Sequence, residues 1–334
     1  MPLSLKAGCD GQRRSIVSEQ VYHFGFGVDA RYVKYAGVLM TNLVHQHLGQ
    51  PLCFHLACDG IGEEDKRRLD AFTMLYRNVE LYIYDMTKML DRLNQIRSDA
   101  PQRLHRSVLL RVLLPAYVPQ NVERLVYMDA DMICLRPLDE LFRLELGDNA
   151  VAAVSIHSAK NSAALKLSSG RYFNAGLLVM AVPVWRSREL TQRVVDYYQR
   201  HSENPPLLEQ DALNAVLDGE FTELDECFNF LVEVNNPLTI KYPETAAVLH
   251  CVNEAKAWTK GCMPQIYALY WRYVRLSLWH DLQPSEPNTA KAVFLAGVTA
   301  ELNGEKDDAI KYYGAVAKRL MEYYLEEKPE LLNK

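Results

Sequence analysis

The chain has 334 residues, of which 49% are hydrophobic and 24% charged, a composition typical of a globular protein with a sizeable core. Its net charge of −5 argues against a nucleic-acid-binding protein. No run of about 18 uncharged apolar residues predicts a transmembrane helix. The seven cysteines lack zinc-ribbon or CxxC spacing, and residues 1–20 lack a signal-peptide pattern. We therefore expect a cytoplasmic protein in a reducing compartment.

Strands and helices are predicted to alternate through the first part of the chain. Strands are expected over 21–28, 52–57, 79–84 and 124–128, and helices over 31–48, 63–76 and 105–118. This alternation predicts an α/β fold with a mostly parallel sheet, which places ligands beyond the carboxyl ends of its strands. Four aspartates follow these strands and suggest one acidic rim, although each alone is also typical of a cap or turn: Asp29, Asp59, Asp85 and Asp129.

The pattern is looser after residue 135. Further strands are expected over 150–156, 176–182 and 246–252, and helices over 185–201, 211–217 and 264–281. A polar break with prolines over 283–288 precedes two helices between 289 and 327, which meet at Asn303-Gly304-Glu305. These last helices predict a C-terminal helical hairpin.

The segment from Arg124 to Cys134 carries the strongest chemical signal. Its apolar strand ends in Asp129 and Asp131, and the apolar pattern resumes at Met132. Side chains two residues apart on a strand share a side, so these carboxylates are expected to converge. Converging carboxylates repel each other, and a divalent cation such as Mg²⁺ or Mn²⁺ relieves the repulsion. The alternative is a polar turn between two strands.

Four further segments lie in a fixed order around this pair of aspartates. Phe26-Gly-Val-Asp-Ala-Arg-Tyr32 precedes the pair, and Tyr172-Phe-Asn-Ala-Gly176, Glu209-Gln-Asp211, and His250 with Lys256 and Trp258 follow it. Together the five segments resemble, in the same order, motifs of glycosyltransferase family 8. The resemblance covers about residues 21 to 280, and within the family the likeness is to bacterial lipopolysaccharide core glucosyl- and galactosyltransferases.

The resemblance implies an A-type glycosyltransferase (GT-A) fold and a retaining, metal-dependent reaction. Glucose or galactose would move from a UDP-sugar donor to a hydroxyl of a glycan or lipid-linked oligosaccharide acceptor, with lipopolysaccharide core as the expected acceptor. The implied cofactor is Mn²⁺, with Mg²⁺ as the alternative, and the implied metal ligands are Asp129, Asp131 and His250. For His250 alone, the ordinary alternative is a core or surface histidine.

The same resemblance implies roles for other residues. Nine of them would bind the UDP-sugar donor: Gly27, Asp29, Arg31, Tyr32, Arg111, Ala130, Asn174, Gly176 and Lys256. Gln210 and Asp211 are the catalytic candidates; Gln210 would stabilise an oxocarbenium-like transition state, and Asp211 would orient the sugar hydroxyls or begin its helix. Asp29 has a helix cap as its alternative role, and Arg111 a surface position. Glu209 and Arg31 depart from the family pattern, which often has Asp and a small polar residue there.

Other classes of protein share single features with the chain. Gly25-Phe-Gly-Val-Asp-Ala30 fits the fingerprint of a Rossmann-type NAD(P)-dependent oxidoreductase, but Asp59 lies too far along the chain for the acid that this fold requires. A haloacid-dehalogenase-like phosphatase also has Asp-x-Asp after an apolar strand, but leaves the Asn174, Gln210 and His250 matches unexplained. A non-enzymatic sugar-binding or scaffold protein ranks low, because the metal ligands are intact.

The C-terminal part bears on partners and on domain organisation. Residues 265–280 combine aromatic and basic side chains, which suit peripheral contact with the inner face of a membrane; the favoured alternative is a helix packed on the main domain. The hairpin resembles one tetratricopeptide repeat, which predicts packing on that domain or a homo-oligomer. We expect a flexible N-terminus (1–20), a catalytic domain (21–282) and a helical extension (283–334).

Overall fold

The computed structural model describes residues 20–95, 106–201, 209–232, 242–252 and 256–327. Within them, a seven-stranded sheet has the order β3-β2-β1-β4-β7-β6-β8, and a three-stranded sheet has the order β5-β10-β9. The larger sheet contains β1 (Tyr22–Asp29), β2 (Leu52–Asp59), β3 (Val79–Asp85), β4 (Arg124–Met128), β6 (Val151–Ala153), β7 (Leu177–Ala181) and β8 (Thr222–Glu223). The smaller sheet contains β5 (Met132–Cys134), β9 (Phe230–Leu231) and β10 (Val248–His250).

Strand directions confirm the predicted α/β class with a mostly parallel sheet. β1 runs parallel to β2 and β4, β2 to β3, and β6 to β8, whereas β7 runs antiparallel to both β4 and β6. β3 forms one end of the strand order, with Tyr82 and Ile83 exposed. The parallel half therefore comes first in the chain, as the alternation of strands and helices predicts.

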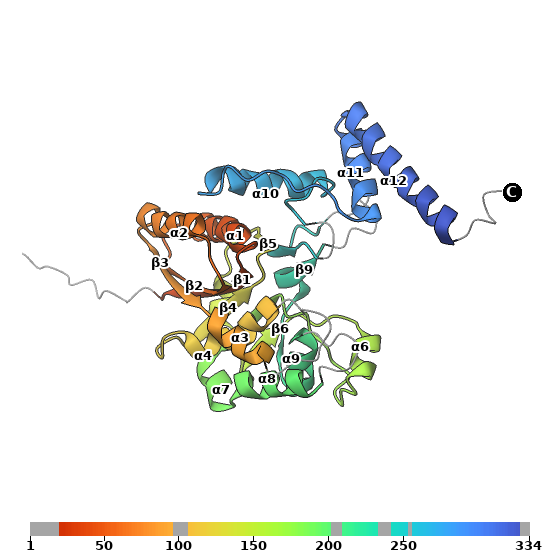
Figure 1. Cartoon of the computed structure of the whole chain (residues 1–334). Coiled ribbons are helices and arrows are strands. Elements are labelled where there is room, and N and C mark those ends of the chain that lie inside the picture. Colours follow the sequence, from red (N-terminus) through yellow and green to blue (C-terminus); the bar gives the residue numbers. More distant parts are fainter. Residues whose placement is uncertain (1–19, 96–105, 202–208, 233–241, 253–255, 328–334) are drawn as a thin grey trace, which may run out of the picture.

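Helices cover both faces of the larger sheet (Figure 1). One face carries α1 (Val33–Gln46), α2 (Glu63–Leu75) and α10 (Pro264–Leu276); the other carries α3 (Thr87–Gln95), α4 (Leu110–Tyr117), α7 (Val182–Ser187), α8 (Leu190–Arg200) and α9 (Glu209–Leu217). Shorter elements are α5 (Asp139–Arg143), α6 (Ala159–Ala164), and the 3₁₀ turns η1 (Arg106–Leu109) and η2 (Glu226–Asn229).

The alternation of residue size along β1 explains how the two faces pack. Phe24 and Phe26 are fully buried in the core beneath α1. Gly25 and Gly27, which alternate with them, face α4: a Cβ at Gly25 would lie 2.8 Å from Leu114, and one at Gly27 would lie 2.8 Å from a carbon of Leu110. Large residues therefore fill one face, and the absence of side chains lets α4 approach the other.

The helices differ from the prediction in three places. The helix expected over 185–201 is wrong as a single element, because Glu189 adopts a left-handed conformation with φ of 51° and separates α7 from α8. Within the predicted helix 105–118, residue 105 lies outside the described residues, and the described part begins as the 3₁₀ turn η1 before continuing as α4. The helix α3 was not predicted; it follows a turn in which Asp85 accepts a hydrogen bond from the Thr87 amide.

Helix α10 packs on the main domain, as the favoured alternative predicted. Tyr270, Trp271 and Tyr273 on this helix, and Trp279 after it, are all buried in the core that also contains α1. These rings are therefore not available to a lipid headgroup interface in this structure. No helix among the described residues is long and apolar enough to cross a membrane.

The predicted C-terminal hairpin is present as α11 (Ala290–Leu302) and α12 (Lys306–Glu327), which lie beside each other beyond the end of α10 (Figure 1). Its small core contains Ala296, Ala300 and Tyr312. Packing on the main domain occurs at Gly261, where an added Cβ would lie 2.7 Å from the Ala296 amide nitrogen. Self-association through these helices and the domain boundaries remain predictions, and residues 1–19 lie outside the described part.

Gly37 on α1 offers a direct test of this packing, because a Cβ there would overlap the buried ring of Trp279. We expect Gly37→Ala to destabilise the protein by roughly 1–3 kcal/mol, the usual effect of overpacking. Gly314→Ala on α12 is the matched control, since no atom lies within 4 Å of its added Cβ, and it should be neutral or slightly stabilising. Urea unfolding measures both; equal effects would contradict the assigned packing.

Candidate metal and nucleotide site

The site is built around the crossing from the larger sheet to the smaller one. β4 ends at Met128, and Asp129 to Asp131 form a turn that leads into β5. The Asp129 amide donates to the Gly176 carbonyl at 2.8 Å, and the Asp131 carbonyl accepts from the Cys251 amide at 2.9 Å. The two carboxylates therefore converge in a turn, not through the strand alternation used to predict them.

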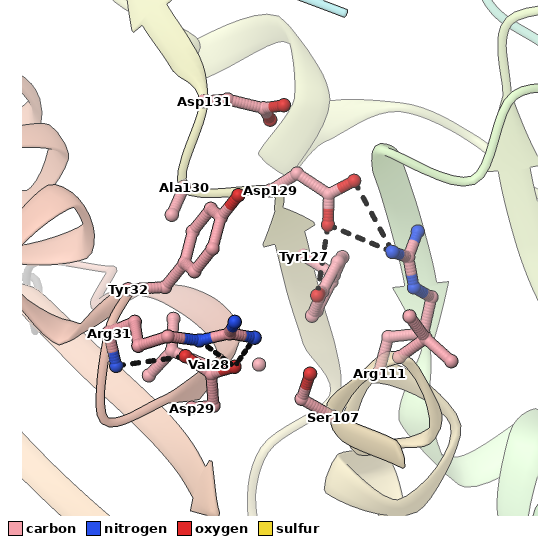
Figure 2. Close-up of a pocket in the computed structure, with 12 residues that line it drawn as sticks. Val28, Asp29, Arg31, Tyr32, Ser107, Arg111, Tyr127, Asp129, Ala130 and Asp131 are labelled. Atoms are coloured by element: carbon pink, nitrogen blue, oxygen red, sulfur yellow. Dashed lines mark hydrogen bonds and ion pairs between the residues drawn. The ribbon is translucent and has the colours of Figure 1, made fainter. Parts of the chain in front are cut away.

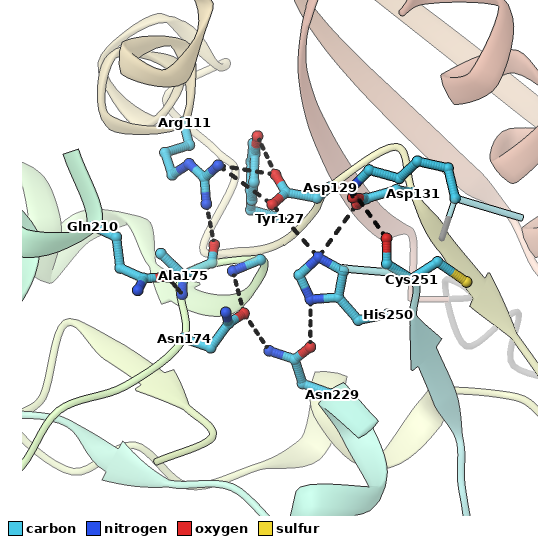
Figure 3. Close-up of polar contacts among 12 residues, drawn as sticks. Arg111, Tyr127, Asp129, Asp131, Asn174, Ala175, Gln210, Asn229, His250 and Cys251 are labelled. Carbon is cyan, nitrogen blue, oxygen red and sulfur yellow. Dashed lines mark hydrogen bonds and ion pairs between the residues drawn. The ribbon is translucent and has the colours of Figure 1, made fainter. Parts of the chain in front are cut away.

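Three of these side chains could hold a metal ion. One ligand atom from each of Asp129, Asp131 and His250 lies within 4.8 Å of the other two (Figure 3). Nε2 of His250 is 3.2 Å from Oδ1 of Asp131 and 4.0 Å from Oδ2 of Asp129. Oδ1 of Asp131 is buried and accepts no hydrogen bond from the described residues. A buried carboxylate oxygen without a donor, beside an imidazole nitrogen, fits a cation that prefers O and N ligands.

The two carboxylates differ in their electrostatic surroundings. Burial raises the pKa of Asp129, although Arg111 opposes this effect. Burial also disfavours the charge on Asp131, but His250 and Lys256 outweigh it and lower the pKa of Asp131. The site therefore holds one firmly ionised carboxylate, and a second that a nearby cation would keep ionised.

Arg111 is buried, so the alternative prediction of a surface position is wrong. Its guanidinium is buried, lies 3.1 Å from Asp129 and 3.3 Å from Glu209, and donates to the Ala175 carbonyl at 2.6 Å. Burial alone would lower the pKa of Arg111, but Asp129, Tyr127 and Glu209 together raise it, so the cation persists. The longer side chain of Glu209 thereby joins a buried ion triad with Arg111 and Asp129.

A chain of side-chain amides fixes His250 from the opposite side. Nδ1 of His250 lies 2.9 Å from Oδ1 of Asn229, and Nδ2 of Asn229 donates to Oδ1 of Asn174 at 2.8 Å (Figure 3). The same Asn174 oxygen accepts from the Gly176 amide at 2.9 Å. A Cβ at Gly176 would overlap the His250 ring, so glycine is required there. A proton held on Nδ1 by Asn229 leaves the Nε2 lone pair directed at the aspartates.

The predicted catalytic residues lie at the start of α9. Oε1 of Gln210 accepts from the Ala175 amide at 2.9 Å, and its Nε2 donates to the Tyr172 hydroxyl at 3.0 Å. The same hydroxyl donates to Asp211 at 2.6 Å. Gln210 is thus held at both ends of its amide, beside Asn174 and Ala175 (Figure 3).

A pocket of about 390 Å³ adjoins the aspartates. It is lined by Gly27, Val28, Asp29, Arg31, Tyr32, Ser107, Val108, Arg111, Tyr127, Asp129, Ala130 and Asp131 (Figure 2). The lining includes eight of the predicted donor-binding and metal residues, namely Gly27, Asp29, Arg31, Tyr32, Arg111, Asp129, Ala130 and Asp131. Asn174, Gly176, Gln210, Asp211, His250 and Lys256 lie outside the lining. Asp59 and Asp85 of the proposed rim do not line it either.

Two cations lie against acids in this region. Arg31 pairs with Asp29 at 2.6 Å and also donates its amide to that carboxylate at 2.9 Å. Asp29 therefore closes a turn before α1 but does not cap the helix, whose N-cap is Tyr32. Lys256, predicted to bind the diphosphate, forms an ion pair with Asp131 and donates to the Cys251 carbonyl.

The oxidoreductase fingerprint does not have its required structural context. Gly25 and Gly27 lie inside β1, against Leu114 and Leu110, and not in a turn that leads into a helix. A dinucleotide fingerprint needs its glycines in that turn, where the backbone approaches the pyrophosphate. These glycines instead serve the packing of α4.

The sequence did not single out several residues that complete the site. Asn229 orients His250, Tyr172 links Gln210 to Asp211, and the Tyr127 hydroxyl donates to Asp129 at 3.1 Å. Tyr127 lies two residues before Asp129 on β4, so the alternation of strand faces could have identified it. No comparable local pattern marks Asn229.

Known proteins are similar to this chain in fold and in sequence. The crystal structure described as galactosyltransferase LgtC in complex with donor and acceptor sugar analogs matches with a TM-score of 0.60 at 20% identity, over 74% of this chain and 95% of that one. The lipopolysaccharide 1,3-galactosyltransferase of Salmonella typhimurium is 23% identical over 313 residues, covering 89% of this chain and 91% of the relative. General stress protein A of Bacillus subtilis is 22% identical over 283 residues, covering 79% and 96%.

The similarity to LgtC shows that the fold is the GT-A fold, as the resemblance implied. The profile described as "Glycosyl transferase family 8" matches residues 23–262. The chain belongs to this family. Membership of this family rules out the oxidoreductase and phosphatase alternatives.

The buried ion triad predicts a pH-dependent loss of stability. Arg111→Met would leave Asp129 and Glu209 buried without their cation, so we expect a loss of about 3–5 kcal/mol near neutral pH. Burial already raises the pKa of both acids, and removing Arg111 would raise it further. Because the folded variant would then bind protons more tightly than the unfolded chain, the loss should shrink as the pH falls.

Urea unfolding of both proteins at about pH 8 and about pH 5 measures this effect. Adding Glu209→Gln to Arg111→Met should restore part of the lost stability, because it removes one unpaired charge. A loss that is independent of pH would contradict the triad.

Proposed function

We propose that the protein is a retaining, metal-dependent hexosyltransferase that moves glucose or galactose from a UDP-sugar to a glycan hydroxyl. The observation that carries the proposal is the convergence of Asp129, Asp131 and His250 beside the pocket that contains Asp29 and Tyr32. Family membership supports transfer of a sugar, and similarity to a lipopolysaccharide 1,3-galactosyltransferase and a lipopolysaccharide 1,2-glucosyltransferase supports the hexose and the acceptor.

The pocket supports binding of a nucleotide. Asp29 would accept hydrogen bonds from uracil or from ribose hydroxyls, and Gly27 lines the same pocket. The ring of Tyr32 lines the same pocket and packs edge-on against Trp258. Arg31 is the departure from the family pattern: its pairing with Asp29 means that the nucleotide would have to share or displace this guanidinium.

The proposed metal is Mn²⁺, with Mg²⁺ as the alternative, held by Asp129, Asp131 and His250. When bound, this ion would supply Lewis-acid stabilisation of the charge on the UDP leaving group. A mixed set of carboxylate oxygens and one imidazole favours Mn²⁺ over Mg²⁺. Burial disfavours the charge on Lys256, but Asp131 outweighs this effect and raises the pKa of Lys256. The charged Lys256 would therefore add a second cation for the diphosphate.

Gln210 is the proposed catalytic residue, and the sugar would lie between Asn174 and α9. Both ends of its amide are engaged, so the side chain is positioned before substrate arrives. An amide oxygen can stabilise positive charge on the anomeric carbon, but it is a poor nucleophile. We therefore favour departure of UDP and attack by the acceptor on the same face over a covalent intermediate, with Asp211 and Tyr172 fixing sugar hydroxyls.

The acceptor and the location of the protein are proposed from relatives alone. A lipopolysaccharide core acceptor would be lipid-linked, so the enzyme would work in the cytoplasm at the inner face of the membrane. Because the rings of α10 are buried, contact with the membrane would have to use other surfaces than those rings.

Metal dependence is tested by UDP release from a panel of UDP-hexoses with Mn²⁺ or with EDTA. We expect release only with the metal. Asp131→Asn should abolish it without unfolding the protein, whereas Asp70→Asn on the exposed side of α2 should retain it. Full activity in chelator, or normal turnover by Asp131→Asn, would reject the proposal.

The contact between Asn229 and His250 gives a finer test. Asn229→Leu should weaken Mn²⁺ binding by about 10- to 100-fold, because Nδ1 of His250 loses the partner that fixes its proton. Titration of Mn²⁺ in the presence of UDP, followed by electron paramagnetic resonance, measures the affinity. Asn149→Leu, which removes an amide bonded to Thr222 away from the site, is the control and should bind normally. Equal affinity in both variants would show that Asn229 does not position the imidazole.

A further inference from the structure

A second group of metal-ligating side chains lies outside the proposed active site. His23 on β1, and Cys53 and His55 on β2, each place one ligand atom within 4.8 Å of the other two. His23 pairs with Cys53 across the parallel strands, and His55 lies two residues further along β2. All three therefore project from the same face of the sheet, and the register itself brings them together.

The distances within this group are close to those of a metal site. Nδ1 of His23 lies 3.0 Å from Nε2 of His55, and Sγ of Cys53 lies 3.4 Å from the same nitrogen. Nitrogen and sulfur ligands of a tetrahedral zinc lie roughly 3.3 to 3.6 Å apart, so shifts of a few tenths of an ångström would suffice. Cys53 and His55 are almost wholly buried, whereas His23 is half-buried. The group thus has an accessible side.

A neighbouring strand fixes the orientation of His55. Its Nδ1 lies 2.9 Å from the Tyr84 hydroxyl, and its ring stacks on Tyr82 at 5.4 Å between centroids. If Nδ1 donates its proton to Tyr84, the Nε2 lone pair faces Cys53 and His23. Metal-bound histidines usually have such an outer partner on their second nitrogen.

We propose that His23, Cys53 and His55 form a zinc-binding site that is separate from the glycosyltransferase site. One thiolate and two imidazole nitrogens suit Zn²⁺, and hard cations such as Mg²⁺ prefer oxygen ligands. Three protein ligands leave one of four positions for solvent. This donor set differs from that of Asp129, Asp131 and His250, so the two sites would select different metals.

The two histidines already have the protonation state that metal binding requires, whereas the Cys53 thiol must lose its proton on binding. Burial lowers the pKa of His23, and it lowers that of His55 to about 3, so both rings are neutral and can offer a lone pair. Burial, with a smaller effect of Glu80 on β3, raises the pKa of the Cys53 thiol to about 12. Binding would therefore form a Zn–S bond and release the thiol proton to solvent. Glu80 also supplies a nearby negative charge.

Cobalt provides a probe that distinguishes the two sites, because only a thiolate ligand gives Co²⁺ a near-ultraviolet sulfur-to-metal absorption band. We expect the full-length wild-type protein, titrated with Co²⁺ alone, to show this band and to lose it when Zn²⁺ is added. Asp131→Asn should keep the band, because that substitution affects only the oxygen–nitrogen site. The result is thus independent of the proposed transferase activity.

Substitutions on β2 supply matched controls. Cys53→Ser should lose the band, whereas Cys58→Ser, which alters another buried thiol of the same strand, should keep it. His23→Ala, at the half-buried position, should weaken Co²⁺ binding by at least about tenfold. Absence of the band in the wild type would overturn the proposal whatever the variants do. Its persistence in Cys53→Ser, or its loss in Cys58→Ser, would also overturn it.

Discussion

The geometry of the active-site region depends on one constraint, the passage of the chain from the larger sheet to the smaller one between Met128 and Met132. β4 lies in the centre of the larger sheet, whereas β5 pairs with β10. In that pairing His250 lies opposite Met132, so the register alone brings it next to Asp131 across a long stretch of sequence. The metal ligands therefore converge because two sheets meet at a single turn.

The same meeting point concentrates charge away from water. Asp129, Asp131 and Glu209 are balanced by Arg111 and Lys256, and each acid contacts at least one cation. Buried charges are tolerated only with such partners. The arrangement also separates the roles of the acids: Glu209 engages the guanidinium on one side, and Asp131 remains beside the imidazole on the other.

The sequence predicted the parts of the fold that follow from local patterns. Alternation of strands and helices indicated the parallel half, and an apolar strand that stops at Asp129 indicated a polar centre. Features set by a contact between distant segments, or by a local side-chain pairing or backbone conformation without a sequence pattern, were missed. Asn229 carries no local signal, Glu189 interrupts a regular apolar pattern through its backbone, and Arg31 pairs with Asp29 where a ligand contact was expected. The aromatic and basic residues of α10 also suited a membrane interface, but the favoured prediction, packing on the main domain, is the one that the structure confirms.

The position of β3 has a consequence for how copies of the chain could meet in concentrated solution. Among the described residues no strand pairs with the outer side of β3, so β3 is an edge strand whose backbone N–H and C=O groups on that side could pair with another strand. Glu80 on this strand is exposed and negative, which places like charges together when two such strands approach. β8, at the opposite edge of the sheet, is only two residues long and could form few hydrogen bonds with a strand of another copy. Negative charge on β3 and the short length of β8 would therefore both oppose the edge-to-edge pairing of two copies.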